Sequence, residues 1–149
     1  MTPNWSASTA EKALEHRPGH YPYISSTGKT YYLPGSPRMA TWQEAEASAQ
    51  QWMRTHGYPD ARLTSPGPDG GVDIFSSTAI AQVKHHKQPI GPGPIRELVD
   101  LTLYSKYRGW GAVFFSTSGY TALALECGQE WGVPLFQRDH LHQTWVRVA

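Results

Sequence analysis

Three side chains with complementary chemistry lie near the middle of the sequence: Asp73, Gln82 and Lys84. Alternate residues of a strand point to the same side, so Gln82 and Lys84 would share one face of a strand. A two-residue turn at Ser77 and Thr78 would join this strand antiparallel to the preceding one. In that register Asp73 falls directly opposite Gln82, which gathers an acid, an amide and a lysine into one cluster. A slip of one residue would separate them.

This cluster has the chemistry that phosphodiester hydrolysis needs. The scissile phosphate is anionic, and its transition state carries more negative charge on the oxygens. A Mg²⁺ ion held by the Asp73 carboxylate and the Gln82 side-chain oxygen would polarise the phosphoryl group and acidify a bound water. Lys84 would position that water and stabilise the developing charge. Gly70 and Gly71 carry no Cβ, so a phosphate backbone could approach closely. A solvated hairpin face is the alternative explanation.

The segments around the hairpin show the patterns of regular helices and strands. Thr41 is a suitable N-cap, and Gly57 a suitable stop, for a helix with apolar residues at helical spacing. Pro94 suits the first turn of a second helix. The sequence predicts, in order, a helix at 41–56, strands at 61–64, 72–76 and 78–84, a helix at 94–107, a strand at 111–116, a helix at 120–131, and strands at 133–136 and 145–148 with a helical turn at 139–141 between them.

This order of elements predicts an α/β fold. The first three strands can pair as an antiparallel meander, and the later strand–helix–strand segment suits a parallel crossover. We therefore expect a mixed central sheet flanked by helices, within a domain at residues 41–149. Residues 1–40 are expected to form an N-terminal arm or hairpin extension, because segments 21–24 and 30–33 have the pattern of two short aromatic strands around a turn.

The composition is that of one folded domain. The chain has 149 residues, a net charge of +1 and a single cysteine, Cys127. The lone cysteine excludes an internal disulfide framework and favours a reducing compartment. No apolar run reaches the roughly 20 residues that span a bilayer, and the N-terminus lacks the pattern of a secretion signal, so we expect a cytoplasmic protein without a membrane partner. The nearly neutral charge means that any DNA contact would come from a local patch.

The motif Asp69-Gly-Gly-Val-Asp73, followed by Gln82-Val-Lys84, resembles the Mrr-type branch of the PD-(D/E)XK nuclease superfamily, which has the restriction-endonuclease-like fold. In that branch glutamine commonly replaces the usual acid before the lysine. Further matching positions follow in the order of the family, between about residue 41 and residue 141: Glu46 on the first helix, and the segments 95–98, 115–120 and 132–135.

The resemblance implies a restriction-endonuclease-like core of order αβββαβ. It implies that Asp73 is the metal-binding acid, that Gln82 is the second motif position and metal contact, and that Lys84 is the catalytic lysine. Glu46 would add a further contact to metal or water, and an exposed helix glutamate is the alternative. The implied function is a Mg²⁺-dependent DNA endonuclease, with Mn²⁺ as a substitute, that cleaves double-stranded DNA, often in defence and often directed at modified DNA.

Basic residues near the hairpin are candidate contacts to DNA phosphates: His85, Lys87 and Arg96. Basic side chains that only solvate the surface are the alternative for each of them.

Two other functions remain open. The first is a structure-specific nuclease such as a Holliday-junction resolvase, which shares the fold and works as a dimer. The second is a DNA-binding or assembly subunit without turnover, because Gln82 in place of an acid leaves fewer negative charges for a metal. A homodimer would suit either nuclease, since the two antiparallel DNA strands need two related cuts.

Overall fold

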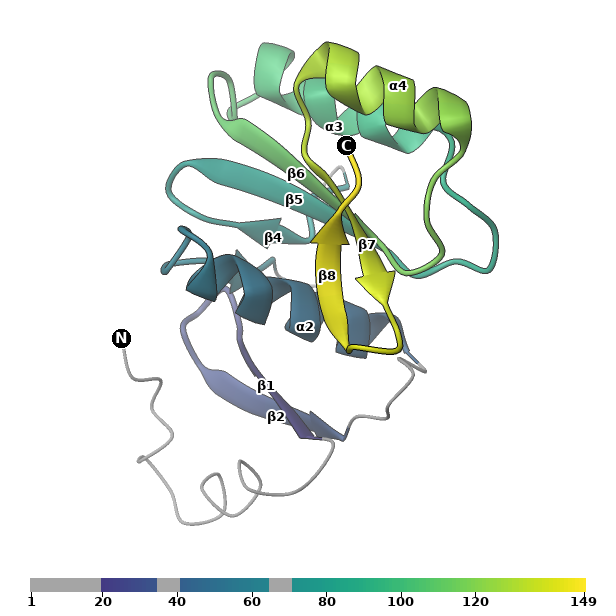
Figure 1. Cartoon of the computed structure of the whole chain (residues 1–149). Helices are drawn as coiled ribbons and strands as arrows, with labels where there is room; N and C mark the ends of the chain where they lie inside the picture. The colour runs from purple at the N-terminus through teal and green to yellow at the C-terminus, as the bar shows by residue number, and fades with distance from the viewer. Residues whose placement is uncertain (1–19, 35–40, 65–70) are drawn as a thin grey trace.

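Two sheets and three helices make up the part of the chain that the computed structural model describes, which is residues 20–34, 41–64 and 71–149 (Figure 1). The elements in chain order are β1 (His20–Ile24), β2 (Thr30–Pro34), α2 (Trp42–Thr55), β3 (Arg62–Leu63), β4 (Ile74–Phe75), β5 (Ala79–Lys84), α3 (Pro92–Tyr104), β6 (Gly111–Ser116), α4 (Ala122–Trp131), β7 (Leu135–Asp139) and β8 (Thr144–Arg147).

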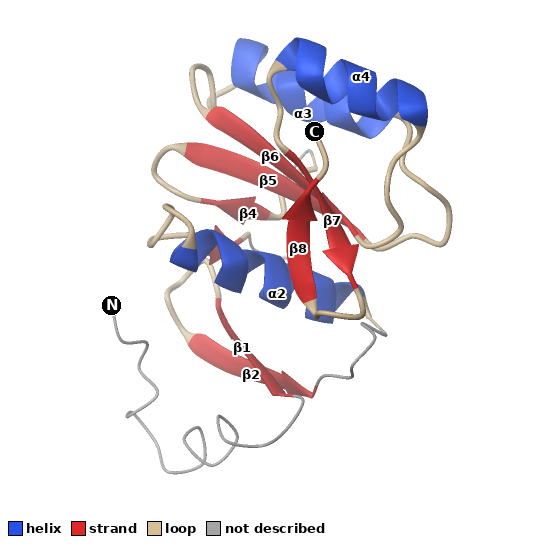
Figure 2. Cartoon of the chain, in the orientation of Figure 1, coloured by secondary structure: helices blue, strands red, loops and turns tan. Residues whose placement is uncertain are grey.

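The central sheet has six strands in the order β3-β4-β5-β6-β7-β8. Strands β3, β4 and β5 pair antiparallel, β5, β6 and β7 pair parallel, and β7 pairs antiparallel with β8. Helix α2 covers one face of the sheet, and α3 and α4 cover the other (Figure 2). The predicted α/β fold, with its meander, its parallel crossover and helices on both faces, is confirmed.

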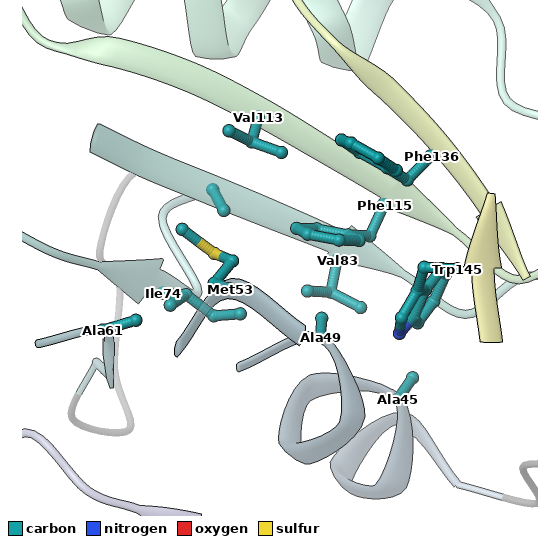
Figure 3. Close-up of a cluster of buried hydrophobic side chains, with 11 residues drawn as sticks. Ala45, Ala49, Met53, Ala61, Ile74, Val83, Val113, Phe115, Phe136 and Trp145 are labelled. Atoms are coloured by element: carbon teal, nitrogen blue, oxygen red, sulfur yellow. The ribbon is translucent and has the colours of Figure 1, made fainter. Parts of the chain in front are cut away.

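Two apolar clusters fill the space between the helices and the sheet. The cluster beneath α2 joins small helix residues to aromatic side chains of β6, β7 and β8 (Figure 3). Its buried members are Ala45, Ala49, Met53, Ala61, Ile74, Ala81, Val83, Val113, Phe115, Phe136 and Trp145. The buried members of the cluster beneath α3 and α4 are Val72, Ile80, Ile90, Ile95, Leu98, Phe114, Ala124, Val133 and Leu135.

Helix α2 forms where the sequence predicts it. The Thr41 side chain accepts a hydrogen bond from the backbone N–H of Glu44, which satisfies one of the free donors of the first turn. The helix ends at Thr55, and Gly57 follows with a φ of 104° that an L side chain rarely adopts. The helix therefore has a fixed start and a fixed stop.

The turn between β4 and β5 is also the predicted one. The backbone N–H of Ser76 donates to the carbonyl of Ala79 at 2.9 Å, with Ser77 and Thr78 between them. The Ser76 hydroxyl accepts from the N–H groups of Thr78 and Ala79, and Asp60 accepts from the N–H of Ser77 at 2.9 Å. These bonds fix the register of the hairpin that carries the candidate site.

The connection between β7 and β8 differs from the prediction. A helical turn was expected at 139–141, but β7 continues to Asp139 and a tight turn leads directly into β8. The Asp139 carboxylate accepts hydrogen bonds from the N–H groups of Leu141 and His142, and Gln143 adopts a φ of 52°. This side-chain capping stabilises a hairpin turn instead of a helix.

The aromatic segments near the N-terminus form the predicted antiparallel hairpin, β1–β2, which lies against α2 (Figure 1). Residues 1–19 and 35–40 of the expected extension lie outside the described residues. None of the helices in the described ranges is long and apolar enough to cross a membrane.

Candidate active site

Asp73 lies at the point where the regular β4–β5 ladder ends. The last pair of the ladder is Ile74 with Ala81, and the N–H of Asp73 also donates to the carbonyl of Ala81, at 2.9 Å. Asp73 is therefore an extra residue beside that pair, in the manner of a β-bulge, and does not continue the ladder opposite Gln82. The prediction that Asp73 lies directly opposite Gln82 is wrong, because this extra residue shifts Asp73 by one position relative to β5.

The displacement aims the Asp73 side chain at the backbone of β5. Its carboxylate oxygen Oδ2 accepts a hydrogen bond of 2.8 Å from the N–H of Val83, the residue next to Gln82. On the other side, the N–H of Thr64 donates to the carbonyl of Asp73 at 3.0 Å. Asp73 is thus held between β3 and β5, and its carboxylate lies beside the strand that carries Gln82.

Gly71 makes room for the Gln82 amide. Its φ is 86°, and a Cβ placed on it would lie 3.1 Å from Gln82 Nε2. The Gln82 side chain is buried. Of the predicted glycine pair, Gly71 therefore contacts a candidate site residue, whereas Gly70, like Asp69 of the motif, lies outside the described residues.

Glu46 comes to the site from α2. Burial first, and the negative charge of Asp73 second, raise the pKa of the Glu46 carboxyl to about 8. Two carboxyl groups from different elements therefore lie close enough for their charges to repel each other. Glu46 is partly buried, so it is not the exposed helix glutamate that the sequence left open.

Lys84 is the last residue of β5 and shares a face with Gln82 by strand alternation. Its carbonyl accepts a hydrogen bond of 3.0 Å from the N–H of Thr117, which follows β6. The side chain is half-buried, and within residues 20–34, 41–64 and 71–149 its ammonium group has no hydrogen-bond or ion-pair partner.

The donor set fits a hard divalent cation. Carboxylates of Glu46 and Asp73 and the amide oxygen of Gln82 are ligand types that Mg²⁺ prefers. A cation would also relieve the repulsion from Asp73, which adds to burial in raising the pKa of Glu46. In the described part of the chain, no three His, Cys, Asp or Glu side chains gather as a metal site. A glutamine oxygen would therefore complete the set.

The three expected DNA contacts differ in their surroundings. His85 is half-buried and its Nδ1 lies 2.9 Å from the Thr117 hydroxyl. Lys87 is exposed in the loop after β5. Arg96 lies on α3, where it pairs with Asp100 at 3.1 Å and covers the Trp131 ring. The structure places His85 and Lys87 after the candidate catalytic strand and gives Arg96 a local packing role.

Two supporting residues were not found from the sequence. Thr117 holds both Lys84 and His85, and its carbonyl contacts His140 Nε2 at 3.0 Å. Gln50, on α2, is almost completely buried. The signal for Gln50 was a polar residue next to the apolar positions Ala49 and Met53, and the signal for Thr117 was its place at the end of a strand parallel to β5.

A six-stranded mixed sheet with α2 on one face and α3 and α4 on the other is the α/β architecture of the restriction-endonuclease-like fold. The Mrr_cat restriction endonuclease family model matches residues 37–145, and the chain belongs to this family, which is part of the PD-(D/E)XK nuclease superfamily. No curated protein and no solved structure matches the chain.

Proposed function

We propose that the chain is a metal-dependent endonuclease that hydrolyses phosphodiester bonds of double-stranded DNA. The observation that carries this proposal is the approach of Glu46 to Asp73 beside the strand of Gln82. Burial first, and the charge of Asp73 second, disfavour the charged form of Glu46, and a cation bound by both carboxylates would offset this cost. Membership of a restriction endonuclease family supports the same reaction class.

Each residue then has a distinct role. Mg²⁺, or Mn²⁺ in its place, would supply a Lewis acid that polarises the phosphoryl group and lowers the pKa of water. Asp73, Glu46 and Gln82 would hold it through their side-chain oxygens. The Lys84 ammonium group would orient the attacking water and stabilise negative charge on the phosphate oxygens. The N–H of Val83 orients the Asp73 carboxylate through the 2.8 Å bond.

The remaining proposals concern DNA and assembly. Lys87, exposed after β5, is the better candidate for a phosphate contact, and His85 is a second one next to Lys84. Arg96 is the weakest, because Asp100 and Trp131 already engage its guanidinium group. A homodimer would bring two sites to the two antiparallel strands of a duplex. We further propose a role in defence against modified DNA, and family membership is its only support.

The test is cleavage of supercoiled plasmid, methylated and unmethylated, in Mg²⁺ or Mn²⁺. Wild-type protein should nick or linearise at least one plasmid, and Asp73→Ala and Lys84→Ala should abolish cleavage while circular dichroism shows a folded chain. Lys106→Ala, which removes an exposed lysine beyond α3, is the matched control and should cleave as the wild type does.

Other outcomes separate the alternatives. Cleavage of a four-way junction in preference to linear duplex would replace the proposal with a structure-specific nuclease. DNA binding without cleavage in either metal, unchanged by Asp73→Ala, would replace it with a non-catalytic binding subunit.

A further inference from the structure

Gln50 is a buried polar side chain on the helix that carries Glu46. It is 1% exposed, and among residues 20–34, 41–64 and 71–149 its amide bonds only to backbone groups. Oε1 accepts from the N–H of Ile24 at 2.7 Å, and Nε2 donates to the carbonyls of Ile24 and Ala61, the latter at 3.1 Å. Burying an amide is costly unless it is hydrogen-bonded, so these three bonds fix one arrangement of the chain around it.

The three bonds join three elements. Ile24 is the last residue of β1, Gln50 lies in α2, and Ala61 comes just before β3. Both polar backbone groups of Ile24 are used by the same side chain. Gln50 therefore fastens the β1–β2 hairpin to α2 and to the edge of the central sheet. This hairpin lies outside the segment 37–145 that matches the family.

The first half of the sheet-facing side of α2 is small, because it carries Ala45 and Ala49, both fully buried. The large side chains of this side, Trp52 and Met53, come only in its second half. A second polar tie lies on the side of β7 and β8, where Ser48 Oγ accepts from Arg138 and from the Trp145 indole, each at 3.1 Å. The position of α2 along the sheet is thus set by polar bonds on two sides.

Glu46 lies one helical turn before Gln50, and residues four apart lie on the same side of a helix. A shift or rotation of α2 at Gln50 therefore moves Glu46 by a similar amount relative to Asp73, which is held by the sheet. We propose that Gln50 is a positioning residue of the candidate cation site: by fastening the β1–β2 hairpin to α2, it sets the place of Glu46 beside Asp73. This inference rests on the proposed function.

The test measures cation binding and not only cleavage. Mn²⁺ titration followed by electron paramagnetic resonance gives the affinity of the full chain for the metal alone. Gln50→Glu keeps the size of the side chain but replaces the Nε2 donor by an oxygen, which repels the carbonyls of Ile24 and Ala61. The variant should weaken Mn²⁺ binding about tenfold, which is the lower end of the losses seen when residues that orient metal ligands are changed. Gln51→Glu adds the same charge at an exposed neighbouring position and should bind within about twofold of wild type.

Gln50→Met, which is similar in size and apolar, should weaken binding in the same way as Gln50→Glu. Unfolding midpoints are measured beside each titration. A folded Gln50 variant that binds Mn²⁺ as tightly as wild type, even with a lowered midpoint, would assign Gln50 a purely structural role and overturn the inference.

Wild-type protein provides an independent measurement if the variants do not fold. Coupling between two sites is reciprocal, so Mg²⁺ bound next to Glu46 should slow amide hydrogen exchange at Ile24. Exchange at Ile24 that does not change when Mg²⁺ binds would overturn the inference while leaving the proposed function intact. Wild-type protein that binds no divalent cation would overturn both.

Discussion

At the scale of single residues, the site depends on how close the fold holds two carboxyl groups. Glu46 comes from a helix and Asp73 from an irregular step beside a strand, and neither is fully exposed. Burial and the charge of Asp73 raise the pKa of Glu46 to about 8, so without a cation the folded site retains a proton near neutral pH. The protonation of one glutamate is therefore linked to folding and to cation binding.

The pH dependence of stability tests this link. Between about pH 5 and pH 8, the folded chain keeps a proton on Glu46 that the unfolded chain, with its ordinary pKa of 4.5, has released. In EDTA, this contribution to the free energy of unfolding is complete at low pH and is lost as pH rises toward 8. Glu46→Gln stays neutral and should have a flatter profile. Urea unfolding across this range measures both proteins, and equal slopes would contradict the assignment.

A second residue-scale prediction concerns Gly71. In Gly71→Ala, the φ of 86° costs about 1–2 kcal/mol for an L side chain, and the new Cβ would lie 3.1 Å from Gln82 Nε2. We expect a lower free energy of unfolding and weaker Mn²⁺ binding. Gly93→Ala, on α3 with nothing within 4 Å of the added Cβ apart from its chain neighbours, should instead leave binding unchanged. Equal effects of the two substitutions on Mn²⁺ binding would contradict the role of Gly71 in leaving room for the Gln82 amide.

At the scale of elements, local chemistry predicted most of the fold. The capping residue Thr41, the stop at Gly57 and the two-residue turn at Ser77 and Thr78 each act over a few positions, and all three formed as expected. The step at Asp73 was not predictable from alternation, since a bulge adds one residue without changing the composition of the strand.

Contacts between residues far apart in the sequence are the other features of the fold that could not be predicted from the sequence. The bonds of Gln50 with Ile24 connect residues 26 positions apart, and the bond between Ser48 and Trp145 connects residues 97 positions apart. Only the assembled tertiary structure brings such partners together. For the same reason, the pairing of Arg96 with Trp131 on the neighbouring helix could not be separated from a DNA contact in advance.

The packing of α4 against β7 predicts a substitution that lowers the free energy of unfolding without changing Mn²⁺ affinity. A Cβ on Gly128 would lie 2.5 Å from Cδ1 and 2.8 Å from Cγ of the buried Leu135. Gly128→Ala should therefore lower the free energy of unfolding by about 1–3 kcal/mol through overpacking. Mn²⁺ affinity below the unfolding transition should stay that of wild type. Gln129→Ala, at the exposed next position, is the control for both measurements, and a loss of affinity in Gly128→Ala alone would link α4 to the site.

At the scale of the whole molecule, one helix and one hairpin from adjacent layers create the candidate site. Asp73, Gln82 and Lys84 belong to the β4–β5 segment, and Glu46 belongs to α2. Helix α2 covers one face of the sheet that contains this hairpin (Figure 2). The net charge of +1 provides no strong overall attraction to DNA, so local contacts next to the site have to carry binding. Catalysis and DNA contact would therefore depend on the same small region of the surface.

Plasmid nicking by wild-type protein and by Asp73→Asn tests directly whether the Asp73 carboxylate holds the catalytic cation. Asparagine keeps the size of the side chain and an oxygen that can accept from the N–H of Val83, but it removes the negative charge that would hold the cation. We expect Mg²⁺-dependent nicking by the wild type and a rate at least about a hundredfold lower for the variant, with DNA binding retained. Nicking by Asp73→Asn at the wild-type rate would contradict a site built on this carboxylate.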